Sequence, residues 1–398
     1  MDMKSIITRR VAEIIDEKHL TNRLRSKSKL RVKLGIDPTG ADLHLGHAVP
    51  LWKLREFQEA GHKAVFIVGD WTAMIGDPSG KDETRKALTR KEVEINARHY
   101  FDQAYLILDK SKTEVHLQSE WFKKFGLADV IHLESLVSEQ QLLAHETFRA
   151  RIQKGLPVRH HETLYPLLQG YDSMMVKSDV EIGAMEQKFN VLMGREVQKA
   201  YGQKPQDVML VKYLIGLDGK EKMGKILNNY IALHDAPAEM FGKIMSLPDS
   251  LIMHYFELCT EVPEKDLQEF EKALAGKSLN PKEIKEKLGR EIVTIYHGKK
   301  KAEEAQKTFE TKFSKGAGEV KADFELKKSA GEYNIIDLLV EGKLASSKSE
   351  AKRKIAEGAV DVDGAKVFDD KAKATLNKKT LIRLGKRFLR IKSGHAQI

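Results

Sequence analysis

The hydrophobic positions in the first part of the chain change from strand-like to helix-like spacing and back again. Residues 31–36 place apolar side chains at every second position, which is typical of a strand. Residues 45–60 repeat apolar side chains at helical intervals and end at Gly61, and residues 64–68 are an unbroken apolar run. A strand, a glycine-containing loop, a helix and a buried strand make a βαβ unit, so we expect a parallel sheet.

The alternation of helices and strands continues to about residue 215. The further elements expected are a helix at 90–108, a strand at 115–117, a helix at 187–201 and a strand at 208–215. A loop rich in glycine and lysine follows at residues 218–229, and residues 237–313 have the spacing of charged helices. The pattern predicts an α/β domain at residues 1–230 and a helical domain at 231–315.

The last part of the chain restarts its apolar pattern after a stretch rich in glycine and lysine. That stretch, residues 316–332, is predicted to be a linker with little regular structure. Residues 333–398 then have the spacing of a helix at 349–357 and of short strands at 360–362 and 381–384. We expect a small α+β domain here.

Composition narrows the class of protein. The 398 residues are 41% hydrophobic and 32% charged, as in an ordinary globular protein. No run approaches the roughly 18 apolar residues that a membrane helix needs, and charged residues interrupt the first 15 positions, so we expect a cytoplasmic protein without a membrane partner. The single cysteine, Cys259, excludes an internal disulfide and a cysteine-based zinc site.

The excess of basic residues is uneven along the chain. The net charge is +10, and residues 371–398 contain nine Lys and Arg but no Asp or Glu. Such a tail often serves only solubility. A folded basic module attached to an enzyme nevertheless favours a nucleic-acid partner.

The first candidate site is the pair His44 and His47, which follows the first expected strand at the start of a helix. Zinc is the rival interpretation, but the HExxH pair of zinc enzymes has different spacing and a glutamate between, so no metal site is predicted. A helix N-terminus offers free N–H groups to a phosphate, and Gly46 lets a flat ligand such as adenine approach the backbone. Two unrelated histidines, one on the surface and one in the core, are the simpler alternative.

Two further sets of polar side chains complete the candidate chemistry. Lys222 and Lys225 lie in the glycine-rich loop. Alone they are most simply solvent-exposed, but beside a nucleotide they would neutralise the charge on a leaving pyrophosphate. Tyr165, Gln169 and Asp172 fall on one face of an expected helix among apolar residues. Most polar stripes face solvent, whereas buried polar groups need partners that a bound ligand would supply.

Together these segments resemble the bacterial tyrosyl-tRNA synthetases. The motifs that carry the resemblance are, in chain order, Asp37-Pro38-Thr39, His44-Leu45-Gly46-His47, Gly76-Asp77-Pro78-Ser79-Gly80, the stripe Tyr165, Gln169 and Asp172, and Lys222-Met223-Gly224-Lys225. Their order and spacing match over residues 30–235. Residues 344–351 and 358–364 are similar to parts of the S4 RNA-binding module that such enzymes contain.

The resemblance implies a Rossmann-like parallel-sheet catalytic domain of class I, an α-helical anticodon- and tRNA-binding domain, and a small α+β S4 domain. It also implies that the carboxylate of L-tyrosine attacks the α-phosphate of ATP, giving tyrosyl-adenylate and pyrophosphate, and that the tyrosyl group then passes to tRNA(Tyr). ATP is a substrate accompanied by Mg²⁺, no tightly bound cofactor is implied, and members of the family are homodimers. Catalysis would consist mainly of positioning and charge stabilisation.

The resemblance assigns roles to individual positions. The residues implied to contact ATP or its phosphates are His44, His47, Thr39, Gly46, Glu186, Lys222 and Lys225. The residues implied to contact tyrosine are Asp172 at the phenol, Tyr165, Gln169 and Asp77 at the α-ammonium group, and also Asp37 and Gln187. The residues implied to contact RNA are Lys348, Lys352, Arg353 and Arg387.

Four positions depart from the usual pattern of that family. Ile226 stands where a serine or threonine usually follows the second lysine, which predicts slower or altered loop closure rather than inactivity. Glu186 is one methylene longer than the usual aspartate, and Ala184 adds a methyl group to a usual glycine. Lys33 stands where many members have a tyrosine.

Other functions agree with parts of the pattern. A tryptophan-specific synthetase, or a ligase that adenylates small acids, would share the two histidines, but the polar stripe and the S4-like tail argue against both. A catalytically impaired paralogue that acts as an RNA-binding protein would explain Ile226, Ala184 and Glu186. Such a paralogue would bind tRNA and release no pyrophosphate.

Overall fold

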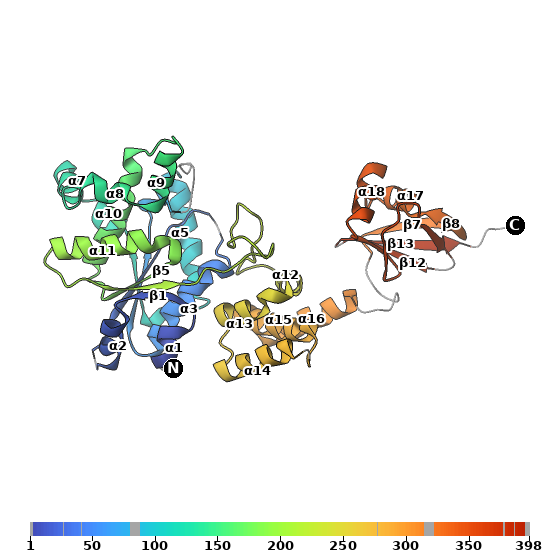
Figure 1. Ribbon diagram of the computed structural model, residues 1–398, viewed down its shortest axis with the longest axis horizontal. Helices are drawn as coiled ribbons and strands as arrows, with labels where there is room; N and C mark the ends of the chain where they lie inside the picture. The colour runs from blue at the N-terminus through green and yellow to red at the C-terminus, as the bar shows by residue number, and fades with distance from the viewer. Residues whose placement is uncertain are drawn as a thin grey trace. The chain divides into compact units, whose positions relative to one another are not determined.

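The computed structural model describes residues 3–26, 28–40, 42–79, 88–276, 278–313, 322–376, 379–385 and 387–394. It divides into two compact units, Met1–Ala302 and Glu303–Ile398, whose elements are labelled in Figure 1. Within the described ranges, no helix is long and apolar enough to cross a membrane.

A six-stranded sheet forms the centre of the first unit. Its strand order is β1-β6-β5-β2-β3-β4, with β1 antiparallel to β6 and all other neighbours parallel. The strands are β1 (Val11–Ile15), β2 (Arg31–Ile36), β3 (Lys63–Val68), β4 (Thr113–Leu117), β5 (Val180–Ala184) and β6 (Asp207–Val211). The α/β fold with a parallel sheet is therefore confirmed. The edge strand β1 was not predicted, because the strand is only five residues long and its partner, β6, lies far along the chain.

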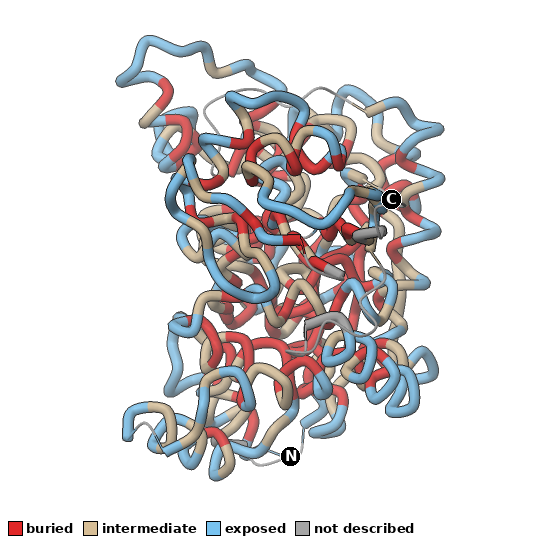
Figure 2. Tube along the Cα trace, turned by 90° about the vertical axis from the view of Figure 1, so that its right-hand side faces the viewer, coloured by how far each residue is buried: buried red, intermediate tan, exposed pale blue. Residues whose placement is uncertain are grey.

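The inner strands are buried on both faces, as parallel strands usually are. All residues of β6 are buried, and in β3 all but the first. In Figure 2 buried residues are red, and they are surrounded by intermediate residues in tan and exposed residues in pale blue. The continuous apolar runs in the sequence therefore mark the central strands.

Helices cover both faces of this sheet (Figure 1). α3 (Leu45–Glu59) connects β2 to β3 and packs against both of them. α10 (His160–Met175) and α11 (Lys188–Ala200) pack against each other on the opposite face. The other helices of this region are α1 (Met3–Thr8), α2 (Glu17–Arg25), α4 (Thr72–Ile75), α5 (Arg90–Ala104), α6 (Ser119–Phe122), α7 (Leu127–Glu134), α8 (Glu139–Leu143) and α9 (Glu146–Gln153), with short 3₁₀ turns η1 (Lys110–Lys112) and η2 (Met185–Gln187).

The chain order reverses between the central strands β2 and β5. From β2 the chain crosses through α3 to β3 on one side, and from β5 it crosses through α11 to β6 on the other. Ligands of open α/β sheets bind outside the carboxyl ends of the strands at such a switch point. Asp37 follows β2, and Glu186 lies two residues after β5, so the fold brings candidate residues to this point.

Helices follow β6 and are tied to the sheet region by two arginines. Arg10 donates from Nε to the carbonyl of Leu258 at 3.0 Å and from Nη2 to that of Thr260 at 2.5 Å, and Arg9 donates from Nη1 to the carbonyl of Val262 at 2.8 Å. These bonds satisfy carbonyl groups at the end of α13 and in the loop that follows it. The helices are α12 (Pro237–Met245), η3 (Asp249–Leu251), α13 (Ile252–Cys259), α14 (Glu264–Ala275), α15 (Pro281–His297) and α16 (Lys299–Phe313).

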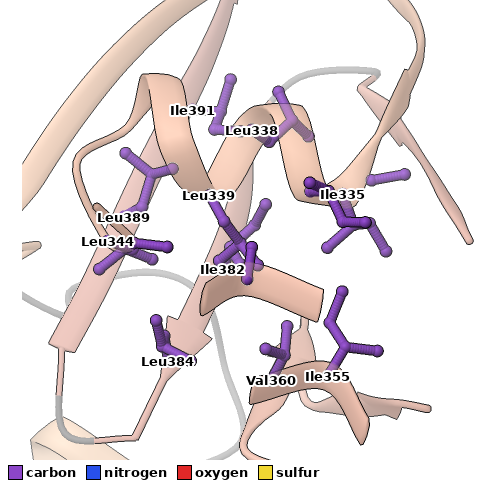
Figure 3. Close-up of a cluster of buried hydrophobic side chains, with 14 of the residues drawn as sticks. Ile335, Leu338, Leu339, Leu344, Ile355, Val360, Ile382, Leu384, Leu389 and Ile391 are labelled. Carbon is purple, nitrogen blue, oxygen red and sulfur yellow. The ribbon is translucent and has the colours of Figure 1, made fainter. Parts of the chain in front are cut away.

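The second unit is a small α+β fold. A five-stranded sheet has the order β10-β9-β12-β13-β7, and a two-stranded sheet pairs β11 with β8. The apolar faces of its helices and strands form one core, drawn in Figure 3. Its elements are β7 (Phe324–Ser329), β8 (Gly331–Asn334), α17 (Ile335–Glu341), α18 (Lys348–Ala356), β9 (Val360–Val362), β10 (Ala365–Val367), β11 (Lys373–Leu376), β12 (Lys379–Leu384) and β13 (Arg387–Gly394).

The prediction of a linker at residues 316–332 is wrong for residues 322–332, the part of it that the structure describes. β7 and the start of β8 lie there, and β7 pairs in parallel with β13, with Phe324 opposite Leu389. The local pattern did not show this strand, because Phe324 and Leu326 are its only apolar side chains and its partner comes at the end of the chain. Residues 316–321 of the predicted linker lie outside the described residues.

Candidate active site

The two histidines of the first motif lie together at the start of α3. His44 is the N-cap residue, its backbone N–H donates to Nδ1 of His47 at 3.2 Å, and the two ring centroids are 3.8 Å apart. The His44 ring also covers Gly46, where an added β-carbon would lie 3.0 Å from ring atoms. Burial, Lys225 and Lys222 lower the pKa of His44 to about 3, so this imidazole is neutral near pH 7.

The lysine loop, residues 218–229, contacts the ends of both central strands. Lys222 forms an ion pair with Glu186, beyond β5. Nζ of Lys225 lies 2.8 Å from the position that a β-carbon on Gly40, beyond β2, would take. Two ammonium groups near the switch point and a helix N-terminus suit a ligand with several negative charges.

Asn229 holds the lysine loop from within. Its buried side chain accepts from the backbone N–H of Gly224 at 2.8 Å and donates to the carbonyl of Lys222 at 3.3 Å. It also donates to the carboxylate of Asp218. Ile226, by contrast, is 88% exposed. Asn229 is not predictable from the sequence, because a loop asparagine looks the same there whether it is buried or exposed.

Asp37 receives hydrogen bonds from two elements. The Tyr165 hydroxyl on α10 donates to Oδ2 at 2.9 Å, and Oγ1 of Thr72 donates to Oδ1 at 2.7 Å. Gly69 leaves room for this carboxylate, because a β-carbon there would lie 2.1 Å from Oδ1 of Asp37. Thr39 is exposed, and its backbone N–H donates to the carbonyl of Asp37 at 2.8 Å.

Asp77 forms a second cluster with residues that follow β5. Gln187 donates from Nε2 to Oδ2 of Asp77 at 2.6 Å, and the backbone N–H of Ser79 donates to Oδ1 at 2.9 Å. Asn190, fully buried on α11, donates to Oε1 of Gln187 at 3.0 Å, while its own Oδ1 has no hydrogen-bond partner within the described part of the chain. A buried acceptor of this kind suits a donor on a ligand. Gly80, the end of this motif, lies outside the described residues.

Asp172 is buried on α10, with donors at both of its oxygens. Gln118 donates from Nε2 to Oδ2 at 2.7 Å, and Trp121 donates from Nε1 to Oδ1 at 3.1 Å. Burial raises the pKa of Asp172 to about 7, against the opposing effects of the Lys33 charge and of these two donors. Its carboxyl group therefore changes charge near neutral pH.

A chain of hydrogen-bonding groups joins Asp37 to Asp172. Oγ1 of Thr72 lies 2.7 Å from Oδ1 of Asp37 and 2.9 Å from Oε1 of Gln118, whose amide group donates to Asp172. A hydroxyl has one hydrogen, so Thr72 donates to only one of the two at a time. A ligand with a polar group at each end would meet an acceptor at either end of this chain.

The polar stripe predicted on one helix face is turned into the protein. Tyr165 and Asp172 are buried, and Gln169 is partly buried and donates to Oε1 of Glu181 at 3.1 Å. The partners Gln118 and Trp121 were missed, because they precede Asp172 by 54 and 51 residues and belong to no motif of their own.

The basic residues implied to bind RNA lie in the second unit, where acidic or carbonyl groups accept from them. The pairs are Lys348 with Asp337 at 2.8 Å, Lys352 with Asp370 at 3.2 Å, Arg353 with Glu357 at 3.7 Å, and Arg387 with the carbonyl of Leu344 at 2.6 Å. The first three basic side chains are mostly exposed. A phosphate would compete there with weak surface ion pairs.

Two family models together match most of the chain. Residues 25–314 match the tRNA synthetases class I (W and Y), and residues 314–395 match the tyrosine–tRNA ligase SYY-like C-terminal domain. The match to the first model covers most of the first unit, including the motifs from Asp37 to Lys225.

Curated relatives are similar over nearly their whole length. A tyrosine–tRNA ligase of Thermotoga maritima is 46% identical over 393 residues, which are 98% of each chain. One of Dehalococcoides mccartyi is 46% identical over 384 residues, which are 96% of each chain. The tyrosine–tRNA ligase 2 of Vibrio cholerae is 46% identical over 366 residues, which are 92% of each chain.

Solved structures share the fold at lower identity. The tyrosyl-tRNA synthetase of Archaeoglobus fulgidus, complexed with L-tyrosine, has a TM-score of 0.61 at 21% identity and covers 77% of this chain and 100% of that one. The tryptophanyl-tRNA synthetase of Plasmodium falciparum has a TM-score of 0.60 at 15% identity, with 77% and 88% covered. The fold alone therefore does not distinguish the two amino acids.

Proposed function

Since this chain belongs to the class I tRNA synthetases of the tryptophan and tyrosine group, and within them to the tyrosine–tRNA ligases, we propose that the residues at the carboxyl ends of β2 and β5 form its active site. The reaction joins L-tyrosine to tRNA(Tyr) with consumption of ATP. Tyrosine–tRNA ligases are 46% identical to it over almost the full length, whereas the tryptophanyl-tRNA synthetase of Plasmodium falciparum is 15% identical.

ATP binds at the start of α3. The neutral imidazole of His44, the His47 ring and the positive end of the α3 dipole hold the nucleotide, and adenine approaches the backbone at Gly46 once the His44 ring has moved aside. Glu186 binds the ribose after it has exchanged Lys222 for the sugar hydroxyls. Support comes from the neutrality of His44, which can donate and accept in one orientation.

The first step forms tyrosyl-adenylate. A carboxylate oxygen of tyrosine attacks the α-phosphorus, the bond from that phosphorus to the bridging oxygen breaks, and pyrophosphate leaves with the electron pair. Lys222, Lys225 and Thr39 stabilise the growing negative charge. Mg²⁺ arrives with the phosphates as part of the substrate. Within the described ranges, no three His, Cys, Asp or Glu side chains converge to hold it separately.

Tyrosine lies along the chain of groups from Asp37 to Asp172. Its phenol donates to Asp172, and its α-ammonium group is held by Asp77, Tyr165 and Gln169, with Asp37 and Gln187 behind them. The observation that carries this proposal is the buried Asp172, which has the one carboxylate of the polar stripe and a pKa of about 7.

In the second step, the 3′-terminal ribose hydroxyl of tRNA(Tyr) attacks the tyrosyl carbonyl carbon and AMP leaves. The second unit, which is similar to an S4 module, contacts the tRNA phosphates through Lys348, Lys352, Arg353 and Arg387. The helices from α12 onward face the same tRNA, and two copies of the chain form a homodimer. The nine Lys and Arg residues at positions 371–398, a range without Asp or Glu, support the RNA contact.

Pyrophosphate exchange with each amino acid in turn tests this function. Tyrosine is expected to stimulate exchange, and Asp172→Asn is expected to reduce the preference for tyrosine over phenylalanine by about 10- to 100-fold, because a hydrogen bond to a charged group contributes roughly 1.5–3 kcal/mol. The KM for ATP should stay unchanged. Stimulation by tryptophan and not by tyrosine would contradict the assignment.

A further inference from the structure

A buried ion pair lies next to the proposed tyrosine site. Lys33 on β2 and Glu181 on β5 are cross-strand partners, and Nζ of Lys33 is 2.9 Å from Oε1 of Glu181. The two side chains are 0% and 1% exposed. The reaction steps described above give the pair no task. Its net contribution to stability is small, because the desolvation of two charges offsets most of their attraction.

The surrounding hydrogen bonds attach this pair to α10. Lys33 donates from Nζ to the carbonyl of Gln169 at 2.9 Å and to Oγ of Ser173 at 2.7 Å. Glu181 accepts from Nε2 of Gln169 at 3.1 Å and from Oγ of Ser173 at 2.9 Å. Gln169 is therefore bound to the pair through both its backbone carbonyl and its side-chain amide. These bonds fix the turn of α10 that contains Asp172.

The pair also acts on the charge of Asp172. The Lys33 ammonium group stabilises the ionised carboxylate, and Glu181 opposes it. On its other sides Asp172 meets the neutral donors Gln118 and Trp121. Lys33 and Glu181 reach α10 from the sheet through Gln169 and through Ser173, which directly follows Asp172 in the chain.

We propose that Lys33 and Glu181 are positioning residues for substrate recognition: Lys33 keeps Asp172 a carboxylate that accepts the phenol hydroxyl, and Glu181 holds Lys33 and Gln169 in place. This inference rests on the proposed function, in which Asp172 binds the phenol. Without Lys33, two carboxylates would share a dry site, and one of them would take up a proton. A protonated Asp172 donates its own hydrogen and no longer favours a hydroxyl donor.

The pH dependence of the KM for tyrosine, measured by pyrophosphate exchange with the full-length protein, tests the pair. In the unchanged protein the KM is expected to rise as the pH falls and Asp172 gains a proton. Lys33→Met should move the midpoint of that rise upward by about one to three pH units, because an opposite charge has been removed. Its KM near pH 7 should increase about tenfold or more, since a shift of one unit changes the ionised fraction by up to that factor.

Glu181→Gln should move the midpoint in the opposite direction, because a like charge has been removed and Lys33 then has Asp172 as its counter-charge. The double variant, which lacks both charges, should fall between the two single variants. The KM for ATP serves as an internal control and should be the same in all four proteins.

Two other titratable groups near this site, His116 and Asp37, need separate consideration as sources of a shifted midpoint. His116 lies with its ring centroid 5.8 Å from that of Trp121 and pairs with Glu114 and Glu120, which raise its pKa against the lowering effect of burial. Asp37 is connected to Asp172 through Thr72 and Gln118. His116→Asn should leave the midpoint in place, and a midpoint that moves in this variant would overturn the proposal.

A pair with a purely structural role would lower the melting temperature in the variants and leave every midpoint unmoved, which would also overturn the proposal. If Lys33→Met does not fold, Glu181→Gln and the double variant give the same test, since their midpoints must differ. An unchanged protein that shows no tyrosine-dependent exchange would instead contradict the proposed function. Exchange with unmoved midpoints contradicts the pair alone.

Discussion

At the scale of single residues, the missing side chain of Gly69 is as important as the charged groups around it. The carboxylate of Asp37 and the hydroxyl of Thr72 occupy the space that a β-carbon would need, 2.1 and 2.3 Å away. The hydrogen bond from Tyr165 to Asp37 therefore depends on a glycine that makes no polar contact through a side chain.

Gly69→Ala is predicted to weaken tyrosine binding. The added methyl group must displace Asp37, which overpacks the site and is expected to destabilise the fold by about 1–3 kcal/mol. We expect the KM for tyrosine to rise about tenfold, which corresponds to roughly 1.4 kcal/mol, and the KM for ATP to stay constant. Gly35→Ala is the matched control, since nothing lies within 4 Å of a β-carbon there. A folded Gly69→Ala protein with an unchanged KM for tyrosine would refute this account.

The sequence identifies some candidate site residues and hides others, for a physical reason. His44, Lys225 and Asp172 belong to short motifs or to a helical stripe, which are visible over a few positions. Gln118 and Asn190 become recognisable only through their partners, which lie up to 113 residues away in the chain. Contacts of that kind exist only after folding has brought distant segments together.

At the scale of elements, the lysine loop depends on one buried side chain. Asn229→Ala is predicted to lower the rate of adenylate formation about tenfold or more, because a buried hydrogen-bonding side chain that holds Gly224 and the Lys222 carbonyl is lost. The KM for tyrosine should not change, since Asp172 and Asp37 are untouched. Single-turnover release of pyrophosphate measures this step. Lys220→Ala, an exposed position of the same loop, is the control.

The attachment of α13 to α3 gives a prediction about stability. Arg10 is 1% exposed, pairs with Glu56 of α3 and donates to the carbonyl of Thr260 after α13. Arg10→Met should reduce the free energy of unfolding by about 3 kcal/mol, because buried Glu56 keeps only Lys53 as a counter-charge and the carbonyl groups of Leu258 and Thr260 lose their Arg10 donor. Urea unfolding followed by tryptophan fluorescence reports on this unit, since all three tryptophans lie in it.

Arg55→Met provides the comparison for Arg10. Arg55 and Glu59 form an ion pair at 2.9 Å on the same helix, but both are about one-third exposed, so its loss should amount to less than about 1 kcal/mol. Equal losses in the two variants would show that the buried network does not hold the helices to the sheet.

Elements with a strong local pattern were predictable, and elements defined by distant pairing were not. The expected helix at residues 45–60 and strand at 64–68 correspond to α3 and β3 within one residue at either end. β7 was assigned to a linker, because it has two apolar residues among charged ones, pairs with the distant strand β13 and packs against a core built from later segments. Tertiary context outweighed local composition at that strand.

At the scale of the whole molecule, the division into two units predicts the effect of truncation. A chain that ends after Phe313 keeps α16 whole and removes the second sheet, whereas an end after Glu332 would leave β7 without β13. We expect the shorter chain to retain tyrosine-dependent exchange. Its kcat/KM for tRNA charging should fall about tenfold or more, because phosphate contacts are lost. Undiminished charging at about 0.15 M salt would contradict the RNA-binding role of the second unit.

The parallel pairing of β7 with β13 has a consequence for how the protein is made. A ribosome delivers the first unit early, and domains generally fold as they emerge. The five-stranded sheet, in contrast, closes only when residues 387–394 are available to β7. Translation of a truncated mRNA would thus release a protein that activates the amino acid but lacks a complete second unit to bind the tRNA. Only complete translation yields both halves of the enzyme.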